Sequence, residues 1–144
     1  MSKLKANKQI NGTFGTLWVN KEKWMDVESF EATVNFDFED SNMCEDLATH
    51  KKLMGWNGEG TITVKKVYSR GAQLMGEAAK TGIIPDIELI GKLADPDAYG
   101  SERVSISEVT FNSMTLMKFE KKTKMEEELP FNFADYDFLD KIAG

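Results

Sequence analysis

The chain has 144 residues and a formal net charge of −6, from 18 basic and 24 acidic side chains. A chain of this length can fold as one domain without a metal or a disulfide. The negative charge disfavours proteins that grip nucleic acid by its phosphates or dock on anionic membranes. The lone cysteine, Cys44, excludes an intrachain disulfide and is typical of a reducing compartment. Residues 1–10 lack the apolar run of a signal peptide, so we expect cytoplasmic synthesis and no membrane anchor.

The acidic residues are gathered in two segments. Residues 24–49 and 125–140 hold eight and six of the 24 acids, and neither contains Lys or Arg. The rest of the chain therefore has 18 basic against 10 acidic residues, a net charge of +8. Complementary segments of this kind can bring copies of one chain together. A solvated charged surface is the simpler interpretation of the same pattern.

The clearest local pattern is an unbroken alternation of polar and apolar residues at 29–39, which follows a first strand predicted at 14–19. A period of two is typical of a strand with one buried face. We expect the apolar face, which includes Phe30, Phe36 and Phe38, to pack against the subunit's own core. On that expectation, Phe36→Asp would bury an unpaired charge and abolish folding.

Residues 40–58 have no period and are predicted to form a long loop. Loops of this length without secondary structure are uncommon inside domains and are often functional. Gly55, Gly58 and Gly60 suggest flexible backbone at the base of the loop. Its apolar side chains could cover the same domain or a neighbouring subunit, and the sequence favours neither; they are Met43, Leu47, Leu53, Met54 and Trp56.

The remaining elements are shorter. Strands are predicted at residues 61–67, 84–90, 103–111, 114–119 and 125–133. Pro130 would place the last of these at a sheet edge or a bulge, and a phase change between Ile106 and Val109 indicates a bulge there. One helix is predicted between an N-cap at Ser69 and a stop at Gly82. The fold class is mainly β, an antiparallel β-sandwich or barrel of packed sheets with one flanking α-helix.

No catalytic, metal or cofactor site is predicted. The single histidine, His50, stands beside Lys51 with no nucleophile pattern around it. Glu45 and Asp46 would raise the pKa of the Cys44 thiol and disfavour a reactive thiolate. The glycines at 55–60 lack the Lys-Ser/Thr and the following helix that a phosphate loop needs.

Six segments occur in one order along nearly the whole chain: residues 10–12, 30–34, 58–69, 100–104, 109–113 and 127–136. They read ING, FEATV, GEGTITVKKVYS, GSERV, VTFNS and EELPFNFADY. In their order, spacing and total length they resemble the PBSX XkdM-type family of phage tail tube proteins, found in contractile phage tails and phage-like bacteriocins.

The resemblance implies a single tail tube domain over residues 1–144 and no catalytic residues. It implies hexameric rings that stack into a hollow tube, which conducts DNA or penetrates the target cell envelope. The implied partners are other copies of the chain, a sheath protein outside, and tape-measure and baseplate proteins, with DNA only as transient cargo. The implied location is the tail of a virion or phage-like particle.

The resemblance also assigns a use to the two patterns described above. The polar face of residues 29–39 and of the next strand would line the tube lumen; these residues are Glu31, Thr33, Asn35, Asp37, Thr61, Thr63 and Lys65. An acidic lumen would repel DNA phosphates instead of retaining them. The loop at 40–58, or a hairpin in its place, would reach adjacent subunits or adjacent rings.

Three other classes of protein remain open from the residues alone. A monomeric β-sandwich binding module could present Trp18, Trp24 or Trp56 to a carbohydrate, although hairpin packing is the simpler role for the first two. A small barrel enzyme is disfavoured by the lack of a catalytic pattern. A related ring-forming protein of a baseplate or secretion-system tube would share the architecture and differ in its partners.

Overall fold

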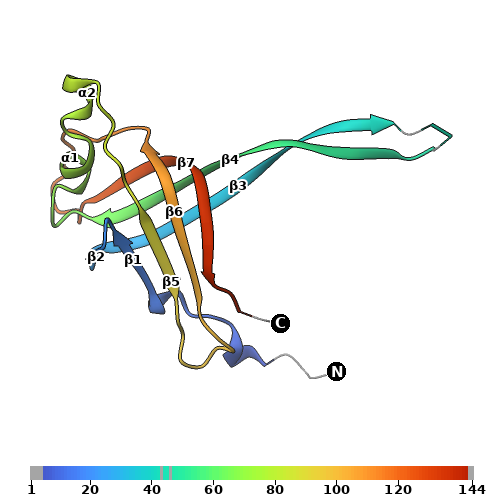
Figure 1. The fold of residues 1–144 in the computed structure, drawn as a ribbon. Helices are drawn as coiled ribbons and strands as arrows, with labels where there is room; N and C mark the ends of the chain where they lie inside the picture. The colour runs from blue at the N-terminus through green and yellow to red at the C-terminus, as the bar shows by residue number, and fades with distance from the viewer. Residues whose placement is uncertain (1–4, 43, 46, 143–144) are drawn as a thin grey trace.

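The computed structural model describes residues 5–42, 44–45 and 47–142, and its strands form one antiparallel sheet. The strand order is β2-β1-β5-β6-β7-β4-β3 (Figure 1). The strands are β1 (Gly15–Val19), β2 (Glu22–Trp24), β3 (Val27–Asn42), β4 (Thr49–Lys65), β5 (Leu89–Leu93), β6 (Glu102–Phe111) and β7 (Glu126–Asp140). The helices are η1 (Ala6–Lys8), η2 (Gly12–Phe14), α1 (Arg70–Met75) and α2 (Ala78–Thr81). The prediction of a mainly β, antiparallel fold is confirmed, although one continuous sheet replaces the expected packed sheets.

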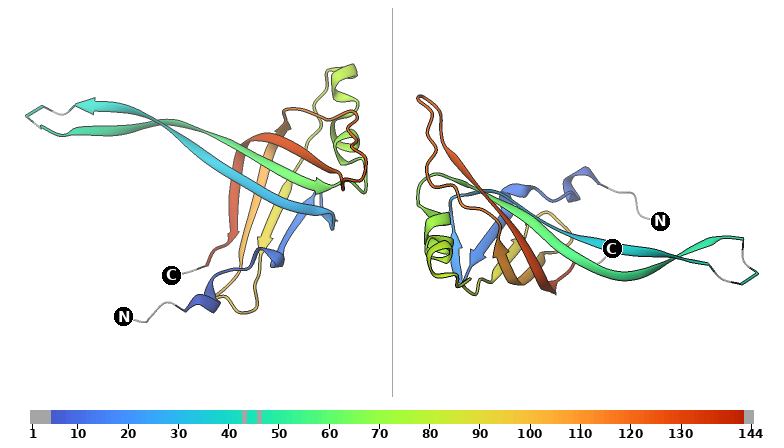
Figure 2. Two further views of the ribbon diagram at one scale, coloured as in Figure 1. Left: turned by 180° about the vertical axis from the view of Figure 1, so that it is seen from behind. Right: turned by 90° about the horizontal axis from the view of Figure 1, so that it is seen from above.

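The sheet bends at β7, because the two ends of this strand pair with different neighbours. Residues 126–133 of β7 pair with β4, and residues 131–140 pair with β6. The β3–β4 pair therefore crosses over the β1–β5–β6 layer (Figure 2, left). The two halves pack face to face. The ring of Phe30 on β3 lies 3.0 Å from the position that a Cβ on Gly91 of β5 would occupy. Pro130 does not lie in an edge strand, and its missing N–H falls on the side where β6 ends.

The hydrophobic core fills the space between the two halves. Side chains that point inward from successive strands alternate with exposed polar ones, as a half-buried sheet requires. The most deeply buried large side chains are Leu17, Ile62, Val64, Leu89, Ile106, Leu129 and Phe131. Val109 is also buried because Glu108 takes a positive φ of 53°, which accounts for the phase change in β6. The register shift in β6 lies elsewhere, between Arg103 and Val104.

The segment predicted as an irregular loop at 40–58 is instead the outer part of a hairpin. β3 pairs with β4 from Val27↔Val64 to Asn42↔Thr49, and the two strands project from the body as a long arm (Figure 1). The pairing steps from Asp37↔Gly55 to Phe38↔Leu53, so Met54 is an extra residue on β4. This bulge interrupts the alternation of polar and apolar residues in β4, so the sequence does not show the period of two that predicts a strand.

The apolar face of β3 does not pack entirely on the core, which corrects a second expectation. Phe30 and Val34 pack against core residues, but Phe36 and Phe38 are 58% and 52% exposed. Both lie on the part of the arm that extends beyond the body. A charge at Phe36 would therefore not be buried within the subunit, so the expectation that Phe36 lies in the core is wrong, and with it the reason given for a loss of folding on Phe36→Asp.

The helical region and two short strands also differ from prediction. Two short helices replace the single helix expected at 69–82, with Gly76 and Glu77 between them. Gly82 ends α2 in the left-handed region at φ 74°, as predicted. Residues 114–119 are not a strand, and the strand expected at 84–90 begins only at Leu89.

Candidate assembly surfaces

A polar face covers the side of β3, β4 and β7 that points away from the core. Register places Glu31 beside Thr61, and Thr33 beside Glu59, while Ser29 lies opposite Thr63. β7 continues these rows, with Pro130 beside Thr61, Asn132 beside Glu59, and Glu128 beside Thr63. A shallow hollow on this face is lined by side chains that include Glu31, Thr33, Glu59, Thr61 and Pro130.

The seven residues predicted to line a lumen do not all lie in the same part of this face. Glu31, Thr33, Thr61 and Thr63 form its centre. Asn35 and Asp37 lie at the base of the arm, opposite Asn57 and Gly55, and the Asn35 amide donates to Glu59 Oε1 at 3.0 Å. Lys65 lies at the other end of β4 and forms an ion pair of 3.6 Å with Glu28.

Sequence reasoning missed three residues of the polar face, Glu59, Glu128 and Asn132. The alternation at 125–133 already placed Glu128 and Asn132 on one side of a strand, but nothing in the sequence showed that this strand pairs with β4. The carboxylates of Glu31, Asp37, Glu59 and Glu128 make the face negative. Lys65, the one lysine among the residues predicted to line the lumen, is paired with Glu28.

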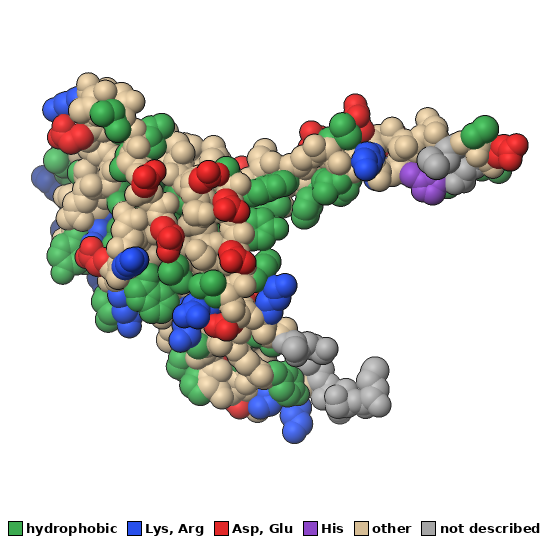
Figure 3. Space-filling view, viewed as in Figure 1, with side chains coloured by type: hydrophobic (Ala, Val, Ile, Leu, Met, Phe, Trp, Pro, Cys, Tyr) green, Lys and Arg blue, Asp and Glu red, His purple; other side chains and the backbone are tan. Residues whose placement is uncertain are grey.

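An apolar strip runs along the other side of the arm and onto the body. Trp56 contacts Tyr136 at 5.5 Å between ring centroids and Phe133 at 6.1 Å. On the arm, Phe36 and Phe38 lie 6.0 Å apart. Hydrophobic side chains gather along this side from the root of the arm (Figure 3). The exposed members, here called the apolar strip, are Phe36, Phe38, Leu53, Trp56, Tyr136 and Phe138.

The residues predicted for an inter-subunit loop are spread along the arm. Leu53 and Trp56 belong to the apolar strip. Met54 is the bulged residue and is exposed, while Leu47 near the turn is fully exposed. Met43 lies outside the described residues. A large group of exposed apolar side chains on one surface usually marks a site of interaction with another molecule.

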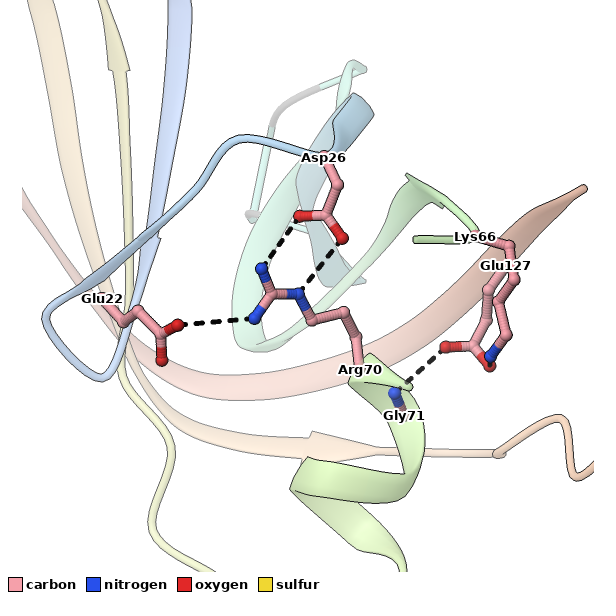
Figure 4. Close-up of polar contacts among 6 residues, drawn as sticks. All are labelled: Glu22, Asp26, Lys66, Arg70, Gly71 and Glu127. Carbon is pink, nitrogen blue, oxygen red and sulfur yellow. Dashed lines mark hydrogen bonds and ion pairs between the residues drawn. The ribbon is translucent and has the colours of Figure 1, made fainter. Parts of the chain in front are cut away.

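A buried ion pair anchors the chain that follows β4. Arg70, the first residue of α1, donates from Nε and Nη2 to the two oxygens of Asp26 at 3.1 and 3.2 Å (Figure 4). The rings of Trp24 and Tyr68 each lie 4.6 Å from the guanidinium carbon. Burial alone would lower the pKa of Arg70, but hydrogen bonding and the charge of Asp26 outweigh it and raise that pKa above its usual value.

Glu127 anchors α1 from the opposite side. Its buried carboxylate accepts a hydrogen bond from the Gly71 amide at 3.0 Å and forms an ion pair with Lys66 at 3.3 Å (Figure 4). Glu127 is therefore a structural residue within β7, and the run of three glutamates does not act as one acidic patch. Both anchors hold the α1 region against the sheet at the end remote from the arm.

In the described part of the chain, no three His, Cys, Asp or Glu side chains converge as metal ligands would. Neither α1 nor α2, nor any other helix among the described residues, has the length and hydrophobicity that a membrane span requires. What the arrangement offers is an acidic face, a projecting arm and an exposed apolar strip.

A family model described as phage tail tube protein matches residues 2–140. The chain belongs to the phage tail tube protein family. Protein XkdM of the phage-like element PBSX of Bacillus subtilis (strain 168) is 34% identical over 142 residues, which cover 97% of each chain. The resemblance read from the six segments is thereby confirmed, and the chain is a structural subunit of a tail tube, located in the tail of the particle.

Two solved structures share the fold of this tail tube protein. A chain of the tube terminating cap of the anti-feeding prophage has a TM-score of 0.75 at 10% identity, over 97% of both chains. A chain of the PVC sheath–tube complex, an extracellular contractile injection system in its extended state, has a TM-score of 0.71 at 10% identity. That match covers 92% of this chain and 93% of the other. At these identities the likeness shows the fold alone.

Proposed function

We propose that six copies of the chain close into a ring and that rings stack into the hollow tube of a contractile tail. The observation that carries the proposal is the arm, which projects from the body and exposes its apolar strip to solvent. Side chains such as Phe36, Phe38 and Leu53 are about half exposed in the subunit, and a neighbouring subunit would cover them. Ring closure also protects the free edge of β3, which would otherwise invite uncontrolled pairing.

The acidic polar face lines the channel in this proposal. Glu31, Thr33, Thr61 and Thr63 lie on one wall, and Glu59, Glu128 and Asn132 extend it; Asn35, Asp37 and Lys65 lie toward its two ends. Six copies of this wall give a channel of net negative charge. Repulsion between carboxylates and phosphates would let DNA pass without retention, if DNA is the cargo.

The partners follow from the same geometry. The outside of the tube contacts the sheath, the lumen holds the tape-measure protein during assembly, and the end of the tube meets the baseplate. One of the chains with this fold comes from a sheath–tube complex, which supports the assignment of a sheath as partner. The role is mechanical, without catalysis or a cofactor.

Sedimentation of the purified chain over a range of concentrations tests the proposal. We expect the 16.2 kDa monomer to give way to a species about six times heavier, and then to much larger polymers, as concentration rises. The variant Phe36→Ser with Phe38→Ser is expected to remain monomeric. A wild-type chain that stays monomeric at every concentration would refute the proposed function.

A further inference from the structure

The segment between β6 and β7, residues 112–125, exposes a second group of apolar side chains, far from the arm. Leu116, Met117 and Phe119 are 83%, 80% and 78% exposed. The segment contains no helix or strand, and it projects from the body (Figure 2, right). Three large apolar side chains within four residues are costly to leave in water. The segment therefore has the composition of a contact surface.

The same segment is strongly basic. Lys118, Lys121, Lys122 and Lys124 are all exposed, and Glu120 is the one acid among residues 112–125. Four lysines against one glutamate give the segment a net charge of +3. The ion pairs within the described part of the chain involve none of these lysines. Their charges are therefore available to a partner outside the subunit.

A turn places two of the lysines at the tip of the segment. The amide of Thr123 donates to the carbonyl oxygen of Glu120 at 3.4 Å, so Lys121 and Lys122 occupy the middle of the turn. Lys122 takes a left-handed φ of 63° there. The exposed apolar side chains lie on the stretch of chain that leads into this turn. Basic and apolar groups are thus presented together on one projecting piece of backbone.

The arrangement of these groups favours a lipid surface over other partners. Within residues 116–119 apolar and basic side chains share one irregular stretch, so a protein partner would need a matching irregular pattern of pockets and acids. An anionic bilayer offers acyl chains below a layer of phosphates at every point. Lysine stems are long enough to keep their ammonium groups at the phosphate level while neighbouring apolar groups insert. A nucleic acid would satisfy the lysines but leave Leu116, Met117 and Phe119 in water.

The net charge of −6 disfavours anionic lipid for the molecule as a whole, but salt limits which acids matter at the segment. The Debye length is about 10 Å at 0.1 M ionic strength, so only nearby charges act strongly. Glu126, the first acid after the segment, lies opposite Lys65 in the β4–β7 register. Glu127 is buried in its ion pair with Lys66. The next acids along the chain therefore do not cancel the positive charge of the segment.

We propose that residues 112–125 bind an anionic lipid surface. Leu116, Met117 and Phe119 enter the boundary between headgroups and acyl chains, and the four lysines contact the lipid phosphates. The contact is peripheral and reversible, because a few apolar side chains and one basic cluster hold far less tightly than a spanning helix. It goes beyond the proposed assembly, since each subunit carries the whole segment and needs no neighbour to complete it.

Vesicle flotation tests the proposal with the full chain, at a concentration at which it is monomeric. Vesicles of phosphatidylcholine with about a quarter phosphatidylglycerol are expected to carry the chain upward in a density gradient. Vesicles of phosphatidylcholine alone, or anionic vesicles at high salt, should bind it about tenfold or more weakly. Polymers of the chain do not float, so assembly cannot imitate binding.

Charge reversal at the turn tests the role of the lysines. Lys121→Glu with Lys122→Glu is expected to lower the affinity for the anionic vesicles by about tenfold or more. Lys23→Glu with Lys141→Glu makes the same change in net charge at exposed sites outside the segment. This control variant is expected to bind as the wild type does. Equal loss of binding in both variants would show that only net charge matters and would overturn the proposal.

Removal of apolar side chains tests the insertion step. Leu116→Ser with Phe119→Ser is expected to lower the affinity by about tenfold or more, because the apolar surface that enters the bilayer is lost. Leu53→Ser with Met54→Ser removes side chains that are 49% and 56% exposed on the arm, and it should leave binding unchanged. Urea denaturation checks that every variant is folded.

Three results would overturn the proposal. The first is a wild-type chain that does not float with anionic vesicles. The second is undiminished binding by the variants of the segment. The third is capture of the chain by immobilised polyglutamate without flotation, which would assign the segment to an acidic protein. None of these results bears on ring formation, and a chain that never forms rings would still float if the proposal is right.

Discussion

Four side chains contact the guanidinium of Arg70, two of them acidic and two aromatic. Asp26 receives two hydrogen bonds in its plane, Trp24 and Tyr68 lie near its faces, and Glu22 approaches to 3.5 Å. The side chains of Arg70 and Asp26 are only 8% and 4% exposed. Removing one partner would leave the other charged group buried alone, which is far more costly than removing both.

Arg70→Met is expected to lower the free energy of unfolding by about 3–5 kcal/mol, because Asp26 would remain buried without its counter-charge. The double variant Arg70→Met with Asp26→Leu is expected to recover most of that loss. Lys80→Met, at an exposed site on α2, should change stability by less than about 0.5 kcal/mol. Urea denaturation measures all three, and equal stability of the single and double variants would show that the pair does not act as a unit.

Two glycines, Gly58 and Gly60, let β4 pack closely against β3 and β7, although the sequence suggested only flexible backbone there. A Cβ on Gly58 would lie 2.4 Å from the ring of Phe133, and a Cβ on Gly60 would lie 2.2 Å from the carbonyl oxygen of Glu31. Neither position has room for a side chain, so Gly58 and Gly60 admit the rings of β7 onto the strand. Gly55, further along the arm, has nothing within 4 Å of its Cβ position.

Gly60→Ala is expected to destabilise the protein by about 1–3 kcal/mol or more, because the added methyl group meets backbone that cannot move aside easily. Gly55→Ala makes the same chemical change on the same strand in open space and should be neutral within about 0.5 kcal/mol. Thermal unfolding of the two variants compares them directly. Similar melting temperatures for both would mean that the strand adjusts more freely than its contacts indicate.

Phe36→Asp is expected to fold with wild-type stability and to fail in assembly. The side chain is 58% exposed, so the new charge stays in water within one subunit but would be buried in a contact between subunits. Circular dichroism and sedimentation measure the two effects. Phe131→Asp is the contrasting variant, because Phe131 is fully buried, and it should not fold. An unfolded Phe36→Asp would restore the original expectation that this face belongs to the core.

Local patterns predicted the elements whose signal lies within one strand. The alternation at 29–39 predicted most of β3, and the glycine at 82 predicted the end of the helical region. The outer half of β4 escaped prediction because the bulge at Met54 shifts its period. The Arg70–Asp26 pair joins residues 44 apart and left no local trace. The exposure of Phe36 depends on how far the arm extends beyond the body. The alternation in the sequence shows which face Phe36 lies on, but not where the body ends.

At the scale of the whole molecule, charge is divided between surfaces that serve different purposes. The polar face of β3, β4 and β7 is acidic, whereas the 112–125 segment is basic. The two acidic segments of the sequence form only part of this face, because Asp26 and Glu127 are buried in ion pairs and Glu39 and Asp40 lie on the outer part of the arm. In a closed ring the acidic face repeats around the channel, and its field adds from every copy.

Glu31→Lys with Asp37→Lys is expected to leave rings and tubes intact, because both side chains are exposed on the polar face. The assembled variant should bind short duplex DNA, with an affinity that falls steeply as salt is raised. Wild-type tubes should bind it weakly at every salt concentration. Glu77→Lys with Asp86→Lys is the control of equal charge near α2, outside the polar face. Equal DNA binding by both variants would place Glu31 and Asp37 away from the channel.

Electron cryomicroscopy of the chain assembled at high concentration tests the proposed assembly most directly. We expect stacked six-fold rings around an open channel, with Glu31, Thr33 and Thr61 on its wall and each arm in contact with a neighbouring copy. A monomer at all concentrations, or a ring in which this face points outward and the arm contacts no other copy, would contradict it.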